Sequence, residues 1–308
     1  MAAIAAKKKR GVNEISNFSN FLINGFFWIY TALCVFPLIL VIAVSFSDEM
    51  QVLLNGYKIW PEKFSLGAYD FLISDWGSII RSYGVSIFVT VVGTIIALTT
   101  MALYAYPISR QDFKHRKVFS FIMFFTLLFN SGLVPYYLLY TQVFSLRDTL
   151  LILMIPFFVQ PFFVLILRTF FTNSVPVALL ESAKIDGASE WRIFGQIVLP
   201  LSLPVLATVG LFCTLNYWND WFQSLLFINQ ENLMTIQFRM YQALLDITFL
   251  SANSTAYSAI LAQNPDFQMP TETVTMAMAV IGIGPIVFAY PFFQRYFVKG
   301  LTVGAIKG

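Results

Sequence analysis

Residues Glu181–Pro200 read ESAKIDGASEWRIFGQIVLP, and this stretch decides how the chain is organised. It carries five charged residues and a central glycine, whereas the sequence on both sides is strongly apolar. The charged residues are Glu181, Lys184, Asp186, Glu190 and Arg192. Charged side chains are costly inside a bilayer. The stretch therefore belongs at a water interface, between two membrane-spanning segments.

The composition of the whole chain indicates that a bilayer is its solvent. Of 308 residues, 58% are hydrophobic and 11% are charged, whereas about a quarter are charged in a typical soluble domain. A membrane-spanning helix needs roughly 20 mostly apolar residues. Six stretches meet this requirement: about 20–46, 79–106, 118–141, 149–171, 201–228 and 274–298. We therefore predict an all-α membrane protein with six transmembrane helices, in which the charged stretch connects the fourth to the fifth.

The distribution of lysine and arginine predicts the orientation in the membrane, because short cytoplasmic loops carry an excess of both. With the N-terminus inside, fourteen of the 19 fall on the cytoplasmic side. These are Lys7, Lys8, Lys9, Arg10, Arg110, Lys114, Arg116, Lys117, Arg168, Lys184, Arg192, Arg295, Lys299 and Lys307. The other five are Lys58, Lys63, Arg81, Arg147 and Arg239. We therefore expect both termini in the cytoplasm, together with His115, which we interpret as a solvated loop residue.

The span pattern divides the chain into four parts. Residues 1–19 form a cytoplasmic N-terminal segment, 20–78 the first transmembrane helix and an external loop, 79–298 a core with five transmembrane helices, and 299–308 a cytoplasmic tail. The basic N-terminus followed by an apolar run is similar to the start of a signal peptide. That run is too long for a signal sequence, and no good cleavage site follows it. We therefore expect the first helix to be retained.

Motifs for chemistry are absent from the sequence. It contains no GxxxxGK[ST] phosphate loop, no HExxH and no Cys/His cluster with metal-ligand spacing. Cys34 and Cys213 lie in predicted spans, where isolated cysteine is usually a small apolar residue. The spans hold almost none of the facing titratable residues that a membrane enzyme requires. We expect no enzymatic activity, no metal or cofactor, no nucleic-acid partner, and an energy source on another chain.

Within the charged stretch, the sequence predicts two short helices joined by a glycine elbow. Residues 173–174 can cap a first helix that ends near Asp186, and Gly187 suits a left-handed position after its end. Ser189 can cap a second helix, and Pro200 then turns the chain into the fifth span. Helical spacing places four apolar residues on one face of the second helix: Trp191, Phe194, Ile197 and Val198. The alternative is an amphipathic interfacial segment that only connects two spans.

The order of residues in this stretch resembles the EAA loop of ABC importer permeases. That pattern reads E-A-A, three residues, G, about nine residues, then I-x-L-P. Here Glu181-Ser-Ala precedes Gly187 at the same spacing, and Ile197-Val-Leu-Pro closes the stretch. Ser182 replaces the first alanine, which is an exchange of one small residue for another.

Further pieces of the chain are also similar to this family. NSGLVPYYLLY, LRTFF and NYWNDWF resemble parts of permeases for complex oligosaccharides such as pectin or aldouronate fragments. The C-terminal QRYFVKGLTVGAIKG resembles the tail of the second permease subunit of maltose-type importers. The resemblance covers roughly residues 80–308. It implies a permease subunit in the bacterial cytoplasmic membrane that takes up an oligosaccharide; the alternatives are another solute, export, or a polytopic membrane enzyme.

The resemblance also implies partners and roles. A second homologous permease, two cytosolic ATPase subunits that hold ATP and Mg, and an external solute-binding protein would complete the importer. The charged stretch would be the coupling helix that docks on an ATPase. Its contact residues would be Glu181, Ala183, Lys184 and Asp186, with Gly187 as the elbow. The tail 305–308 would approach the ATPase, or else be a frayed terminus.

The most polar patch within a predicted span is 216–222, NYWNDWF. Amides and carboxylates in a span should face a bundle interior or a wet cavity, and aromatic faces with polar groups suit a sugar. The candidate solute-path residues are Asn216, Trp218, Asn219, Asp220 and Trp221. The alternative is that the asparagines join helices and the tryptophans belong to the interfacial aromatic belt. The loops 47–78 and 229–273 would face outward, and the second is a candidate dock for the binding protein.

Overall fold

The computed structural model of the chain describes residues 16–73, 76–253 and 271–294. This part is mostly helical, and its β-structure is limited to an isolated bridge between Ser47 and Phe64. The chain divides into two compact units, one formed by Met1–Phe71 with Pro270–Val280 and one by the remainder. The N-terminal cations at 7–10 and the tail 295–308 lie outside the described residues. Their predicted cytoplasmic location stays a prediction.

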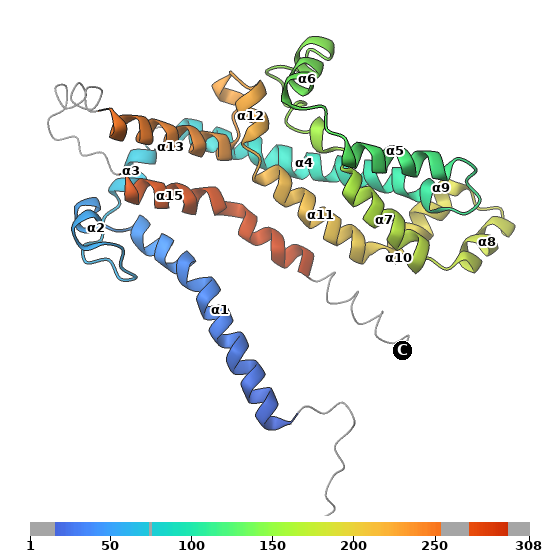
Figure 1. Cartoon of the computed structure of the whole chain (residues 1–308), viewed down its shortest axis with the longest axis horizontal. Coiled ribbons are helices and arrows are strands. Elements are labelled where there is room, and N and C mark those ends of the chain that lie inside the picture. The colour runs from blue at the N-terminus through green and yellow to red at the C-terminus, as the bar shows by residue number, and fades with distance from the viewer. Residues whose placement is uncertain (1–15, 74–75, 254–270, 295–308) are drawn as a thin grey trace, which may run out of the picture. The chain divides into compact units, whose positions relative to one another are not determined.

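The helices of the described residues follow one another in the order shown in Figure 1. The α-helices are α1 (Asn17–Ser45), α2 (Glu49–Asn55), α3 (Gly67–Ile73), α4 (Trp76–Ser109), α5 (Arg116–Leu128), α6 (Leu133–Leu138), α7 (Pro161–Ser174), α8 (Val177–Ile185), α9 (Glu190–Ile193), α10 (Leu199–Leu201), α11 (Leu203–Trp218), α12 (Phe222–Phe227), α13 (Ile236–Ala252) and α15 (Glu272–Ile283). Short 3₁₀ or π segments are η1 (Leu139–Val143), η2 (Ile155–Phe157), η3 (Phe194–Val198), η4 (Glu231–Leu233) and η5 (Gly284–Phe288).

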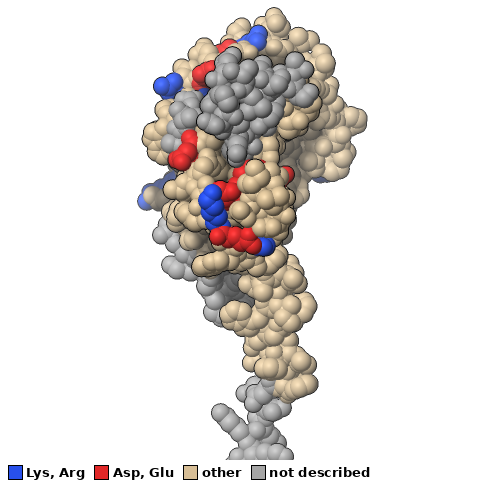
Figure 2. Space-filling view, turned by 90° about the vertical axis from the view of Figure 1, so that its left-hand side faces the viewer, with Lys and Arg blue, Asp and Glu red and all other residues tan. Residues whose placement is uncertain are grey.

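The first unit is built around α1, whose 29 residues include no charged side chain. Most of its large apolar residues are exposed, and Figure 2 shows its surface free of charge in the lower part of the view. A helix that is apolar on all sides suits lipid contact. Within the same unit, the Glu49 carboxylate accepts the backbone N–H groups of Thr271, Glu272 and Thr273 at 2.9–3.0 Å. This carboxylate satisfies the free donors at the start of α15.

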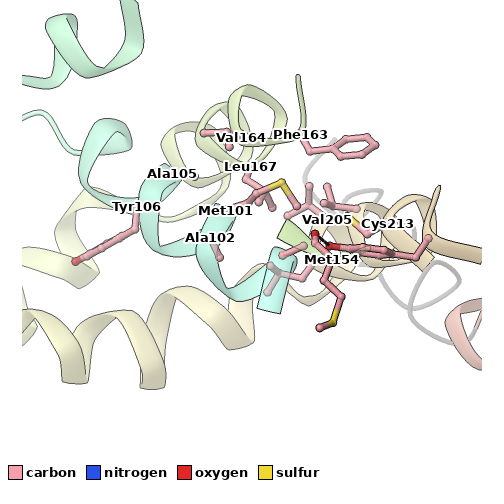
Figure 3. Close-up of a cluster of buried hydrophobic side chains, with 14 of the residues drawn as sticks. Met101, Ala102, Ala105, Tyr106, Met154, Phe163, Val164, Leu167, Val205 and Cys213 are labelled. Atoms are coloured by element: carbon pink, nitrogen blue, oxygen red, sulfur yellow. Dashed lines mark hydrogen bonds between the residues drawn. The ribbon is translucent and has the colours of Figure 1, made fainter. Parts of the chain in front are cut away.

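The second unit is organised by α4, which packs along α7 and α11 (Figure 1). Figure 3 shows the apolar core at this junction, with Met101 and Ala105 of α4 facing Val164 and Leu167 of α7. Small residues on α4 let the neighbouring helices approach closely. At Gly93 of α4, an added Cβ would lie 2.7 Å from the ring of Tyr217.

Replacing Gly93 by valine is expected to destabilise the second unit by about 1–3 kcal/mol, because the added atoms overpack the contact with Tyr217. The buried Tyr217 hydroxyl donates to the Met154 carbonyl at 2.9 Å, so the ring cannot shift without loss of this bond. Gly84→Val is the matched control, since Gly84 lies on the same helix with open space around its Cβ position. The measurement is the melting temperature in detergent; equal melting temperatures for the two variants would contradict the packing argument.

The described part of the chain holds four helices that are long and apolar enough to cross a membrane. They are Phe18–Ser45, Trp76–Ser109, Ile155–Ser174 and Glu272–Gln294. Two bent pairs raise the number to six if each pair is one span. The pairs are Arg116–Leu128 with Leu133–Val143, and Glu190–Leu201 with Leu203–Trp218. The predicted helical class is therefore confirmed for the described residues, which hold four to six helices long and apolar enough to cross a membrane.

The predicted continuous span at 118–141 was wrong in one respect, because the chain bends by 116° between α5 and α6. The break lies at Asn130-Ser-Gly132. The Asn130 side chain accepts the Gly132 N–H at 2.9 Å, and Gly132 has φ +81°. Asparagine and glycine stabilise such turns through a local hydrogen bond and a left-handed backbone. Because the sequence around this turn is apolar, composition alone does not reveal the break.

Two other predicted spans begin or end elsewhere than expected. In 149–171, the chain forms turns before η2, and α7 begins only at Pro161, because proline favours the first turn of a helix. In 201–228, α11 ends at Trp218 and a short break precedes α12. Its start is also displaced: the helical segment continues through Pro200 and bends by 81° around Ser202.

Candidate functional site

The stretch Glu181–Pro200 folds as two helical segments joined by an elbow, as its sequence predicts. Gly187 has φ +76°. The Ala188 N–H donates to the Ala183 carbonyl at 2.9 Å, and the Gly187 N–H donates to the Lys184 carbonyl at 3.0 Å. This pair of bonds is the Schellman motif, which ends a helix on a left-handed residue. Because a Cβ at Gly187 would meet no atom within 4 Å, the requirement for glycine is conformational and not steric.

The second helical segment begins as predicted and the first does not. The Ser189 hydroxyl accepts the Arg192 N–H at 3.3 Å, so Ser189 is the N-cap of α9. The predicted cap at 173–174 is wrong, because α7 runs through Ser174 and Pro176 occupies the N-cap position of α8. Of the four apolar residues expected on one face, Phe194 and Val198 are buried, and Ile197 is half-buried. Trp191 is instead 74% exposed.

An ion-pair network connects the elbow to the loop that follows α4. The Lys184 ammonium lies 2.7 Å from Asp112 Oδ2 and 2.7 Å from Glu190 Oε1. Asp112 also accepts two bonds from the Arg110 guanidinium, at 3.0 and 3.1 Å. The Tyr106 hydroxyl donates to Glu190 Oε2. Lys184 thus joins α8 to α9 and to the loop after α4.

The network is fully charged at neutral pH. The hydrogen bonds from Arg110 and then Lys184 lower the pKa of Asp112 to about 2. The bonds to Asp112 and Glu190 raise the pKa of Lys184. The stabilisation from a carboxylate with a lowered pKa is present above its unfolded value, about 3.9, and is lost as the pH falls through about 2. Changes of pH near neutrality therefore leave the network intact.

We expect Lys184 and Asp112 to be coupled energetically by about 0.2–1 kcal/mol, since both side chains are largely exposed and exposed pairs contribute little. The double-mutant cycle uses Lys184→Gln, Asp112→Asn and the combination, with the free energy of unfolding in detergent as the readout. Raising the salt concentration should reduce the coupling. Strict additivity of the two substitutions at low salt would show that this pair contributes nothing.

The outer surface of the elbow combines free charge with exposed apolar side chains. Ile185 is 86% exposed, and Glu181 and Asp186 are exposed without an ion pair among the described residues. A cavity of about 530 Å³ lies beside the ion-pair network, with mostly apolar walls. Its lining includes Leu103, Tyr106, Phe113, Trp191 and Phe194. An exposed apolar surface next to a cavity is typical of an interface for another protein.

The family comparison places this stretch inside a transport component. Residues 113–303, more than half of the chain, match the family described as "Binding-protein-dependent transport system inner membrane component". The chain belongs to this family of permeases. The family consists of membrane transport subunits and not of enzymes, and its membrane is the inner membrane.

Individual relatives agree with this assignment. The permease is 37% identical over 287 residues to the polygalacturonan/rhamnogalacturonan transport system permease protein YtcP of Bacillus subtilis (strain 168), covering 93% of this chain and 97% of that protein. It is 38% identical over 277 residues to protein LplC of the same organism, covering 90% of each. A solved bacterial ABC transporter involved in the import of the acidic polysaccharide alginate matches with TM-score 0.76 and 27% identity, over 93% of this chain and 100% of that chain.

The five candidate solute-path residues of the permease do not form a single cluster. Trp218 is 2% exposed, and its indole N–H donates to the Gly282 carbonyl at 3.0 Å. Asn219 donates to the Leu215 carbonyl on its own helix. Trp218 is therefore packed in the interior of its unit and not placed in an exposed aromatic belt, and its bond to Gly282 supplies the acceptor that a buried indole needs.

The other three candidates have polar or aromatic partners. The Asn216 amide donates to Gln160 Oε1 at 2.9 Å, which joins α11 to the start of α7. Asp220 is half-buried in the break after α11, and its carboxylate accepts the Gln223 N–H at 3.4 Å. The Trp221 ring is 37% exposed and stacks on Tyr241, with ring centroids 4.3 Å apart.

The sequence interpretation missed two residues that the structure brings to these places. Asp112 lies 72 positions from Lys184, and its only sequence signal is a lone acid in a basic loop. Gln160 lies 56 positions from Asn216, and its signal is a polar residue directly before Pro161 inside a predicted span. Both contacts depend on helix packing and not on local pattern.

Proposed function

We propose that this permease is the membrane-spanning subunit of an ATP-driven importer that takes up an oligosaccharide delivered by an external solute-binding protein. The observation that carries the proposal is the Gly187 elbow in a chain of this family: a stiff, exposed lever with one end tied to α4. The relatives add support for the solute class, since YtcP is named for polygalacturonan and rhamnogalacturonan and the solved neighbour for alginate. These polymers make an acidic oligosaccharide the first solute to test.

The elbow is the proposed contact with a cytosolic ATPase. Glu181, Ala183 and Asp186 face the ATPase, with Ile185 as an apolar contact between them. Lys184 has a different role in this proposal, because its ammonium is already bonded to Asp112 and Glu190. It passes movement of the lever to α4 and α9. The cavity beside Trp191 is large enough for a side chain of the partner.

The remaining parts of the importer lie on other chains. Two ATPase subunits bind ATP and Mg, and a second homologous permease completes the passage. This chain has six spans, with each bent pair as one span, both termini in the cytoplasm, and the elbow on the cytoplasmic side. The tail 305–308, which lies outside the described residues, approaches the ATPase.

The orientation is tested with single cysteines in a background that lacks Cys34 and Cys213. In intact cells, an impermeant thiol reagent should label a cysteine at 250 (Leu250→Cys) and leave Arg10→Cys and His115→Cys unlabelled until the cells are opened. The expectation comes from the excess of lysine and arginine on the cytoplasmic side. Labelling of positions 10 and 115 from outside, with 250 protected, would invert the topology.

We assign each candidate residue of the solute path a role according to its partners in the structure. The Gln160–Asn216 pair and Asp220 supply amide and carboxylate groups for sugar hydroxyls, and Trp221 supplies an aromatic face. Asn219 is exposed and contributes its carbonyl oxygen. Trp218 does not contact the solute in this proposal; its indole N–H bonds to the Gly282 carbonyl and fixes the position of α11 beside the path.

The assignment is tested by isolating the tagged permease from its own host and identifying the proteins that accompany it. We expect an ATPase, a second permease and, when the solute is present, a solute-binding protein. Binding of oligogalacturonates, alginate oligomers and neutral maltooligosaccharides to that binding protein then defines the cargo. Recovery of the permease without any ATPase would contradict the importer assignment, and exclusive binding of a non-carbohydrate would contradict the solute class.

A further inference from the structure

A second cavity of the permease lies between α5 and α7, away from the elbow. Its volume is about 660 Å³. Three cations and an apolar wall line it: Arg116, Lys117 and Arg168, with Phe121, Phe124 and Leu165. No carboxylate is among the lining residues, and within the described ranges none of the three cations has an ion pair. The cavity therefore combines positive charge that no carboxylate balances with an apolar wall.

Arg168 contributes to this cavity a cation that has no ion pair among the described residues. Its Nε–H is buried and has no acceptor in the part of the chain that the structure describes. A buried donor without a partner is unusual in folded proteins. The guanidinium to which Nε belongs presents parallel donors that fit a phosphate. Because Nε is itself shielded, a phosphate or carboxylate in the cavity would bond to the terminal nitrogens of this guanidinium.

The start of α5 gives an independent reason to expect an anion. His115 is the N-cap, Arg116 and Lys117 occupy the first turn, and that turn holds no acidic residue. Positive side chains at a helix N-terminus oppose the helix dipole, whereas an anion there is stabilised by the dipole. An anion at this end of the 13-residue helix would offset the repulsion and bond to both side chains.

The apolar wall decides what carries the anion. Phe121 is 63% exposed, and Phe124 is also exposed. The wall continues into Phe125 and Leu128, further exposed side chains of the apolar helix α5. Inorganic phosphate has no apolar part that could contact this wall, whereas the acyl chains of a lipid would lie along it. Basic pockets between transmembrane helices are known to hold acidic lipid head groups.

We propose that this cavity binds the head group of an anionic phospholipid, with its acyl chains along Phe121 and Phe124 of α5. Arg168 donates to the phosphate from one side, and Arg116 and Lys117 donate from the other. Only the choice of leaflet rests on the proposed function: with both termini in the cytoplasm, the cavity faces the cytoplasmic leaflet. The bound lipid would hold the beginning of α5 against α7.

The test uses the full permease complex in nanodiscs of phosphatidylcholine, with or without added phosphatidylglycerol. The readouts are the phosphatidylglycerol that stays bound through detergent washing and the melting temperature. Arg168→Gln removes the central donor, and Lys117→Gln removes an exposed cation whose loss cannot unfold the chain. Lys114→Gln is the matched control, because Lys114 is exposed in the same basic loop but does not line the cavity.

Phosphatidylglycerol should raise the melting temperature of the wild type and of Lys114→Gln. Each cavity variant should retain roughly fivefold less of it, the factor expected for one lost cation near an acidic lipid. Inorganic phosphate added to pure phosphatidylcholine discs should not stabilise. Equal retention by all variants, equal stabilisation by phosphate, or cross-linking of Lys117→Cys to a partner subunit would overturn the proposal. None of these readouts requires transport, so they stand apart from the importer assignment.

Discussion

Gly187→Val is expected to reduce oligosaccharide uptake by about tenfold or more while the permease still inserts and folds. A branched residue at φ +76° is strained, because the left-handed conformation costs roughly 1–2 kcal/mol for residues with a Cβ. The strain would be relieved by loss of the Schellman bonds from Ala188 and Gly187. The lever would then bend without moving α4. The measurement is uptake together with solute-stimulated ATP hydrolysis in the assembled importer.

Gly195→Val is the matched control for this substitution. Gly195 is also exposed and has open space around its Cβ position, but it lies in the helical segment after the elbow. The control should retain uptake within about twofold, since a surface change without strain has little effect. Normal uptake and normal solute-stimulated hydrolysis in Gly187→Val would refute the lever. Equal loss in both variants would also count against it, because the effect would then not depend on the left-handed conformation.

Trp218→Ala and Trp221→Ala should have opposite consequences, although the residues are only three positions apart. Trp218 is almost fully buried and bonded to Gly282, so its truncation should cost about 3–5 kcal/mol and sharply lower the yield of folded permease. Trp221 is partly exposed and stacked on Tyr241. Its truncation should cost only about 0.5–1.5 kcal/mol and instead change the preference among oligosaccharides.

The two readouts are the melting temperature of the purified complex and the relative uptake of a panel of oligosaccharides. Asp220→Asn, which keeps the shape of the side chain and removes its charge, should act as Trp221→Ala does. If Trp221→Ala and Asp220→Asn lower the melting temperature as strongly as Trp218→Ala, and leave the preference unchanged, the segment is structural throughout. The solute path would then have to be sought on other helices or on the second permease.

The sequence predicted the elbow in detail because its chemistry is local. Gly187 and Ser189 each act on backbone groups within a few positions, so their roles follow from residue type and spacing. The membrane class followed from composition for a similar reason, since a long apolar helix needs no partner to be recognised. One local signal was nevertheless overlooked. The turn residues Asn130-Ser-Gly132 lie in apolar sequence, and the prediction placed a single span across them.

The contacts that no sequence pattern predicted are those between distant segments. Lys184 was expected to face an ATPase, but its bonds to Asp112 and Glu190 arise only when α8 packs at the end of α4. Trp218 and Trp221 look equivalent in the sequence, but Trp218 is buried at the end of α11, whereas Trp221 lies in the break before α12 and is partly exposed.

We expect this permease to move an oligosaccharide under the control of an ATPase and a binding protein. The most direct measurement is uptake of a labelled oligosaccharide into proteoliposomes that contain the assembled importer, with ATP inside and the solute-binding protein outside. We expect uptake that stops when either ATP or the binding protein is omitted, and that falls by about tenfold with Gly187→Val. Uptake that continues without the binding protein or without ATP, or its absence for every oligosaccharide offered by a loaded binding protein, would contradict it.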